Sequence, residues 1–281
     1  MPWKFSDDVE AYAERVVPLL SRDPAAYTIG LSIVDTLRAG HRFGDAPMYF
    51  GWLEEDGEVR GAISRTPPYD LLLSVVPDVE ALVRALREHG AEVPGVNGEV
   101  DTVERFAVAW TAGTALQEST WLQLRMFALG ELEPPAPPPP GRPRLAAEDD
   151  FELAMRWFDA FSEELNLPER MPEARVRALI ADRMLWLWED ETGTPGALAL
   201  RTPASAGVAR INCVYTPPDQ RGRRFGGAVT AASCADALAR EAERMVLFTD
   251  ATNPAPNKVY ERIGFRPIAD HRVVHFNPQP A

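Results

Sequence analysis

The chain has 281 residues, of which 46% are hydrophobic and 9% aromatic, and it carries a formal net charge of −13. Such a composition supplies a buried core and excludes a disordered chain. The acidic balance disfavours nucleic acid and anionic membranes as partners. Because domains typically have roughly 100–150 residues, the length favours two of them.

The two cysteines, Cys213 and Cys234, lie in no CxxC motif or Cys/His cluster. The sequence therefore predicts neither a disulfide framework nor a metal site. Its first seventeen residues lack a basic segment followed by an apolar run, and no apolar stretch approaches the roughly 20 residues that span a bilayer. We expect a cytoplasmic protein.

The first half contains three apolar runs that end in turn residues. Residues 48–53, 59–65 and 71–76 read as strands, with a hairpin turn at Glu55-Asp-Gly, and an amphipathic helix is expected over 78–89. A proline-rich stretch at 131–144 follows, and it favours an extended polyproline II linker. A proline-rich ligand for a partner domain is the alternative interpretation of this stretch.

The second half repeats the strand, turn, strand, turn, strand order of the first. It also predicts four helices and two further strands. Helices are expected over 149–165, 172–182 and 225–242 and in a short segment from Asn253, and strands over 184–188, 196–201, 208–215, 245–249 and 272–276. We infer a tandem repeat of one α+β unit, with domains at 1–132 and 143–281 joined by the linker 133–142.

Only the second repeat places a glycine- and arginine-rich loop between its third strand and the following helix. Gly222, Gly226 and Gly227 allow a close approach of the backbone, and a helix N-terminus favours an anion such as a pyrophosphate. A glycine turn with solvated arginines is the alternative interpretation of the loop taken alone.

About thirty residues later the chain reads Asn253, then Asn257-Lys-Val-Tyr260, then Gly264-Phe265. Together with the loop, this pattern resembles the GNAT superfamily of acyl-CoA-dependent N-acyltransferases. The resemblance covers about 143–281 and extends weakly to 1–132. It implies two tandem GNAT-like α+β domains, each with a mixed, mostly antiparallel sheet flanked by helices, of which only the second is active.

The resemblance implies acetyl-CoA as the cofactor and assigns its site. The pyrophosphate would be held by the backbone amides of the loop. Arg224 departs from the family, which usually has glycine there, so a positive φ at this position would strain the arginine. The expected cofactor-binding residues are Val214, Tyr215, Thr216, Arg221, Gly222, Arg223, Arg224, Phe225, Gly226, Gly227 and Asn253.

Tyr260 matches the family tyrosine that protonates the departing CoA thiolate, and a core tyrosine is the alternative. A backbone N–H near Val214 would meet the thioester carbonyl. Several carboxylates are candidate bases, none of them unique: Glu163, Glu164, Glu189 and Asp190. Cys213 as an acyl carrier, and Trp186 and Trp188 in an acceptor pocket, are weaker expectations than core packing.

The resemblance predicts transfer of an acetyl group to an amine of a small molecule or a protein. The acceptor, the acyl chain length and the oligomeric state are not specified by the sequence. A non-catalytic CoA-binding sensor or scaffold is the alternative, because of Arg224 and the lack of a unique base. A nucleotide phosphate site is disfavoured, since no Gly-Lys-Ser/Thr motif accompanies the loop.

Overall fold

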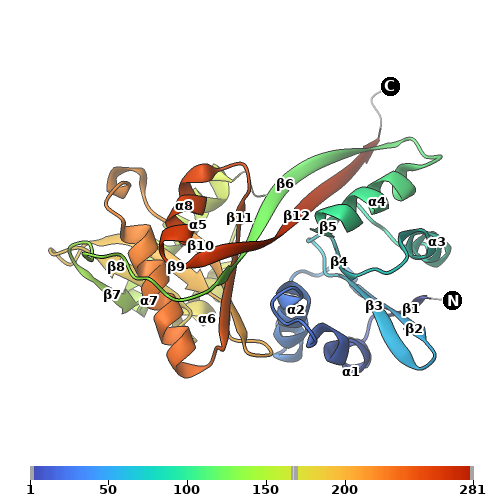
Figure 1. Cartoon of the computed structure of the whole chain (residues 1–281), viewed down its shortest axis with the longest axis horizontal. Helices are drawn as coiled ribbons and strands as arrows, with labels where there is room; N and C mark the ends of the chain where they lie inside the picture. The colour runs from blue at the N-terminus through green and yellow to red at the C-terminus, as the bar shows by residue number, and fades with distance from the viewer. Residues whose placement is uncertain (1–2, 166, 168–169, 279–281) are drawn as a thin grey trace. The chain divides into compact units, whose positions relative to one another are not determined.

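The computed structural model describes residues 3–165, 167 and 170–278, and its chain divides into two compact units (Figure 1). Unit 1 comprises Met1–Met126, Thr249–Asn253 and Ile268–Ala281, and unit 2 comprises Phe127–Phe248 and Pro254–Pro267. The limits expected in chain order, 1–132 and 143–281, differ from this division at three places. Residues 127–142 belong to unit 2, whereas residues 249–253 and 268–281 belong to unit 1.

Unit 1 alternates helix pairs with strands. Its elements are β1 (Trp3–Ser6), α1 (Val9–Leu20), α2 (Thr28–Arg38), β2 (Tyr49–Glu55), β3 (Glu58–Arg65), β4 (Leu71–Val75), α3 (Val79–His89), β5 (Gly95–Glu99), α4 (Val100–Thr111) and the start of β6 (Leu116–Leu129). Local chemistry sets the ends of α3: the Asp78 side chain accepts from the Ala81 N–H at 2.9 Å, and Gly90 ends the helix with φ of 70°.

Unit 2 has the same order of elements. They are β7 (Arg142–Leu145), α5 (Phe151–Glu164), α6 (Glu173–Ala181), β8 (Leu185–Glu189), β9 (Pro195–Arg201), β10 (Val208–Tyr215), α7 (Phe225–Arg240), β11 (Arg244–Asp250), α8 (Pro254–Arg262) and the start of β12 (Phe265–Pro278), with short 3-10 turns at Glu148–Asp150 and Pro218–Gln220. The shared order, strand, two helices, three strands, helix, strand, helix, strand, confirms the tandem repeat.

Both sheets are mixed and mostly antiparallel. In unit 1 the strand order is β1-β2-β3-β4-β5-β12, and in unit 2 it is β7-β8-β9-β10-β11. The β4/β5 and β10/β11 pairs are parallel, as expected where a helix crosses between the two strands. The end of β12 pairs antiparallel with β5, with Arg272 opposite Gly98. The last strand of the second repeat therefore extends the sheet of unit 1.

Helices cover both faces of each sheet. In unit 1, α1 and α2 pack around Phe50 and Tyr12 on one face, and α3 and α4 pack around Ile63 and Leu82 on the other. In unit 2, α5 and α6 cover one face, while α7 packs on the other. The close seat of α7 depends on Gly196, where an added Cβ would lie 2.6 Å from the Phe225 ring.

Several segments differ from the sequence predictions. The last strand begins at Phe265, well before the expected 272. The elements β1, α1, α2 and β7, and those from β5 to β6, were not predicted. The proline-rich segment packs against unit 2: Leu132 contacts its core and the Pro140 carbonyl accepts from Trp188 Nε1 at 3.0 Å. Within the described ranges, no helix has the length and apolar character needed to cross a membrane.

Candidate active site

The predicted site begins where β10 and β11 separate. Their parallel register runs from Val208 opposite Arg244 to Ile211 opposite Leu247, and no later pair joins them in the described chain. The β9 register shifts between Ile211 and Cys213, which marks a bulge at this point of β10. The end of β10, including Val214, therefore lies beyond the parallel pairing, as the resemblance implied for the pantetheine-binding strand.

The three loop glycines are needed for different reasons. Gly222 has φ of +79° and open space where a Cβ would lie, so its conformation alone requires glycine. A Cβ on Gly226 would lie 3.1 Å from Thr216 Oγ1, and one on Gly227 would lie 3.1 Å from Val259 Cγ1. Gly226 and Gly227 thus let α7 approach β10 and α8.

Arg224 has φ of 65° and ψ of 13°, the left-handed conformation, at the N-cap of α7. The positive φ is the case in which the sequence predicted a strained backbone at Arg224, where the family usually has glycine. An L-residue other than glycine pays about 1–2 kcal/mol there. The side chain is exposed, and in the described part of the chain it makes no hydrogen bond or ion pair.

The other two arginines of the loop are held by neighbours. Arg221 donates through Nε to the Thr216 carbonyl at 3.0 Å and through Nη2 to Glu164 Oε1 at 2.5 Å. Arg223 donates to the side-chain oxygen of Gln220, and its guanidinium lies 4.4 Å from the centre of the Phe225 ring. These contacts fix the loop to α5 and to the start of α7.

The N-terminus of α7 offers free donors. The first helical hydrogen bond runs from the Ala228 N–H to the Arg224 carbonyl at 3.2 Å. The amides of Phe225, Gly226 and Gly227 therefore have no partner inside the helix, and they carry the positive end of its dipole. Together with the unpaired Arg224 side chain, they fit the phosphate groups of CoA.

Tyr260, on α8, is partly buried and packs against the core of unit 2, with its ring 6.2 Å from Phe265 in an edge-to-face contact. Burial raises the pKa of its phenol, and the nearby thiols of Cys213 and Cys234 raise it further. The influence of Cys213 places Tyr260 near the bulge of β10. Its phenol stays protonated at neutral pH, as a proton donor must.

Asn253 lies in the turn after β11, where its N–H donates to the Asp250 carbonyl at 3.2 Å. It belongs to unit 1, whereas the loop belongs to unit 2. Its contact with the cofactor stays a prediction.

The candidate bases differ in how they are engaged. Glu189 accepts from Arg142 and Arg144, which lower its pKa, and bonds from Thr192 and Thr194 lower that of Asp190. Their lowered pKa values weaken both carboxylates as bases.

Glu163 and Glu164 end α5, where they pair with Arg170 and Arg221. Burial raises the pKa of Tyr215, and the charge of Glu164 adds to this effect, so Glu164 lies near the end of β10. Sequence reasoning did not anticipate the Glu164–Arg221 pair, because its members are 57 positions apart and no local pattern joins them.

The cysteine and the two tryptophans that were weaker candidates for the site pack in the core of unit 2. Cys213 is buried, and burial raises the pKa of its thiol, so it is held in the unreactive form. Trp186 and Trp188 share the sheet face covered by α7, where Trp188 stacks on Phe225 with ring centres 6.3 Å apart. Neither tryptophan lies on the α5 face, where Tyr215 and Glu164 meet.

Comparison with known proteins agrees with this geometry. Residues 151–265 match the Acetyltransferase (GNAT) family. A search of curated proteins found no match. Residues 151–265 are therefore an acetyltransferase domain of the GNAT family.

Solved structures share the fold of the whole chain at low sequence identity. A Drosophila protein aligns with a TM-score of 0.70 at 14% identity, covering 99% of both chains. A GCN5-related N-acetyltransferase from Sphaerobacter thermophilus aligns at 0.63 and 16%, covering 99% of this chain and 96% of that one. A tandem GNAT protein from the clavulanic acid biosynthesis pathway aligns at 0.58 and 14%, covering 99% of both. The chain thus has two GNAT folds in tandem.

Proposed function

Because unit 2 contains a GNAT acetyltransferase domain, we propose that the protein transfers an acetyl group from acetyl-CoA to an amine of a small molecule or a protein. The observation that carries this proposal is the junction of β10 and α7. There a strand end that is free on its β11 side, a positive-φ glycine and free helix amides come together in 13 residues, from Tyr215 to Gly227.

The loop would bind and orient the cofactor, which supplies the acetyl group as a thioester. The amides of Phe225–Gly227 would hold the pyrophosphate, with Arg224 adding charge. The backbone of Val214, Tyr215 and Thr216 would pair with the pantetheine arm. The N–H of Val214 would donate to the acetyl carbonyl oxygen and stabilise the negative charge that develops there.

Two side chains would move protons. Tyr260 would hold a proton at its phenolic oxygen and donate it to the departing sulfur. Glu164 would accept the proton of the attacking amine, directly or through water, since it lies near Tyr215 at the end of β10. Its ion pair with Arg221 would orient the carboxylate and link it to the cofactor loop.

An assay of thiol release tests this function. The full chain is incubated with acetyl-CoA and a panel of primary amines, polyamines, aminoglycosides and lysine peptides, and products are identified by mass spectrometry. We expect at least one amine to raise thiol release above hydrolysis, and Tyr260→Phe to suppress the increase. Tight acetyl-CoA binding without transfer to any amine would instead support the sensor or scaffold alternative.

A further inference from the structure

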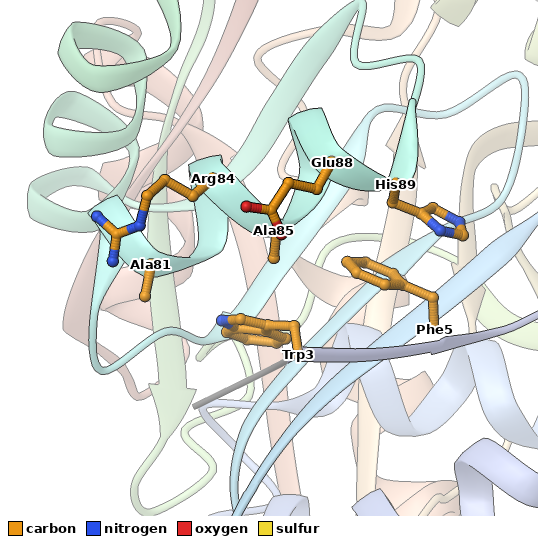
Figure 2. A pocket seen from close by; sticks show the side chains of 7 residues that line it. All are labelled: Trp3, Phe5, Ala81, Arg84, Ala85, Glu88 and His89. Carbon is orange, nitrogen blue, oxygen red and sulfur yellow. The ribbon is translucent and has the colours of Figure 1, made fainter.

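Unit 1 contains a hollow that the acetyl-transfer site does not use. It lies between β1 and α3, has a volume of about 350 Å³, and is bounded by side chains of both elements (Figure 2). Ligand pockets of proteins begin at roughly 300 Å³. Its residues are Trp3, Phe5, Ala81, Arg84, Ala85, Glu88 and His89.

Trp3 forms the floor of the hollow. Its side chain is only 5% exposed and packs over Gly61, where an added Cβ would lie 2.7 Å from Trp3 Cη2. The indole Nε1 is buried and has no hydrogen-bond partner in the described part of the chain. Figure 2 shows this nitrogen on the edge of the ring nearest Ala81. A buried donor without an acceptor costs free energy, so a ligand that placed an acceptor at this nitrogen would recover that cost.

Aromatic rings form one wall. Phe5 and His89 stack with ring centres 4.3 Å apart and planes 10° apart. Tyr49 meets both rings edge-on, at 6.4 Å and 6.2 Å, and its hydroxyl donates to the Glu92 carbonyl at 3.3 Å. The wall is therefore in place before any ligand arrives, which lowers the entropic cost of binding.

At one position that lines the hollow, α3 carries a small residue where α7 carries a charged one. Both helices are followed by Ala-Glu, at Ala91-Glu92 and Ala242-Glu243. Counting back from these pairs aligns Ala85 with Asp236. In unit 2, Asp236 forms an ion pair with buried Arg201 at 3.2 Å. Unit 1 has a methyl group at the corresponding position, and Ala85 lines the hollow.

Two opposite charges lie at the rim. Arg84 and Glu88 are four positions apart on α3, a spacing that ordinarily allows a pair, yet no ion pair joins them in the described chain. Figure 2 shows the guanidinium beside Ala81 and the carboxylate above Trp3. The hollow thus has donors, Arg84 and Trp3 Nε1, toward one end, and the Glu88 acceptor between them and the aromatic wall.

We propose that this pocket binds an α-amino acid with an aromatic side chain. The ligand carboxylate would accept from Arg84 and Trp3 Nε1, its ammonium group would donate to Glu88, and its ring would lie against Phe5 and His89. Arg84 and Glu88 are one helical turn apart, about 5–6 Å between Cβ atoms, so both can reach groups that share one Cα. Such a ligand supplies the acceptor that Trp3 lacks.

Calorimetric titration of the full chain with three probes tests the ligand class. L-phenylalanine carries both charges, phenylacetate lacks the ammonium group, and phenethylamine lacks the carboxylate. We expect L-phenylalanine to bind and each of the other two to bind at least tenfold more weakly. No heat of binding from L-phenylalanine at about 10 mM, roughly ten times the Kd of a weak millimolar site, would overturn the proposal. Phenylacetate binding as tightly as L-phenylalanine would overturn the role of Glu88.

Substitutions test the place of binding. Glu88→Gln should weaken L-phenylalanine binding about tenfold, whereas Glu80→Gln, an exposed carboxylate on the same helix outside the pocket, should leave it unchanged. Ala85→Leu should fill the hollow and abolish binding, with thermal unfolding as the check that unit 1 still folds. Unchanged affinity in both Glu88→Gln and Ala85→Leu would exclude this pocket.

Discussion

Arg224 is held in a conformation that glycine adopts more easily. Its φ of 65° destabilises the folded chain by about 1–2 kcal/mol. A glycine there would remove this strain, but the greater freedom of glycine in the unfolded chain would cost about 0.5–1 kcal/mol of folding free energy. We predict that Arg224→Gly raises the unfolding free energy by about 0.5–1 kcal/mol. Urea unfolding measures this change, and a loss of stability would show that the side chain contributes more than its strain costs.

The raised pKa of Tyr260 keeps its hydroxyl protonated at neutral pH, so this group can donate a proton. Removal of the hydroxyl should therefore slow the chemical step, while the remaining ring keeps the packing of the fold. We predict that Tyr260→Phe lowers single-turnover acetyl transfer by about 10²–10⁴-fold and keeps the affinity for acetyl-CoA. A core role would give the reverse, because phenylalanine keeps the packing of the ring against the core and turnover would stay normal. Wild-type transfer rates in this variant would end the assignment of Tyr260 as general acid.

The buried arginines of the two repeats give a matched test of element packing. Arg65 and Arg201 each end a strand before Thr-Pro, and both are buried. Asp236 and Glu241 bind Arg201, whereas Arg65 makes no ion pair or hydrogen bond to the described residues and acts through its charge on Asp70 and Tyr49. Unpaired buried charges are costly, and an apolar residue often replaces them without loss.

We therefore predict that Arg65→Met leaves the unfolding free energy unchanged or raises it. Glu241→Ala should lower it by about 2–3 kcal/mol, because Arg201 then loses one of its two carboxylates. Chemical unfolding of the two variants side by side compares them. A larger loss in Arg65→Met than in Glu241→Ala would mean that Arg65 has a favourable role that its contacts do not reveal.

The elements that the sequence predicted well are those with a strong local period. Residues 149–165 place apolar side chains at steps of three and four, and α5 runs from Phe151 to Glu164. The strand β6 was not predicted, because its first half is mostly exposed and lacks alternation. The sequence could predict strain at Arg224 only if its φ were positive, and nothing in the local sequence shows that it is.

Strand pairing between distant segments was beyond sequence reasoning. The end of β12 pairs with β5, more than 170 positions earlier, and Phe127, before the linker, is fully buried in the core of unit 2. Pairing of this kind depends on tertiary contacts and leaves no local pattern. The three consecutive strands of each repeat and the helix after them were predictable, but the other elements of unit 1 and the membership of the last strands were not.

Because residues before the linker belong to the core of unit 2, we predict that the fragment 143–281 does not fold into a stable domain. It would lack Phe127, Leu129 and Leu132, which belong to the core of unit 2. A fragment that starts at Phe127 restores them and should be more soluble and more resistant to proteolysis. Circular dichroism and limited proteolysis of both fragments compare them. A stable, fully active 143–281 monomer would contradict the role of these residues.

Calorimetric titration of the full chain with acetyl-CoA tests the central claim, that the β10–α7 loop is the cofactor site. Gly222→Ala and Gly193→Ala form a matched pair, because both glycines have φ near +80° and open space around the added methyl group. We predict one acetyl-CoA per chain, with affinity lowered at least about tenfold by Gly222→Ala, since alanine would distort the loop, and unchanged by Gly193→Ala. A stoichiometry of two, or equal affinities in the two variants, would contradict the account.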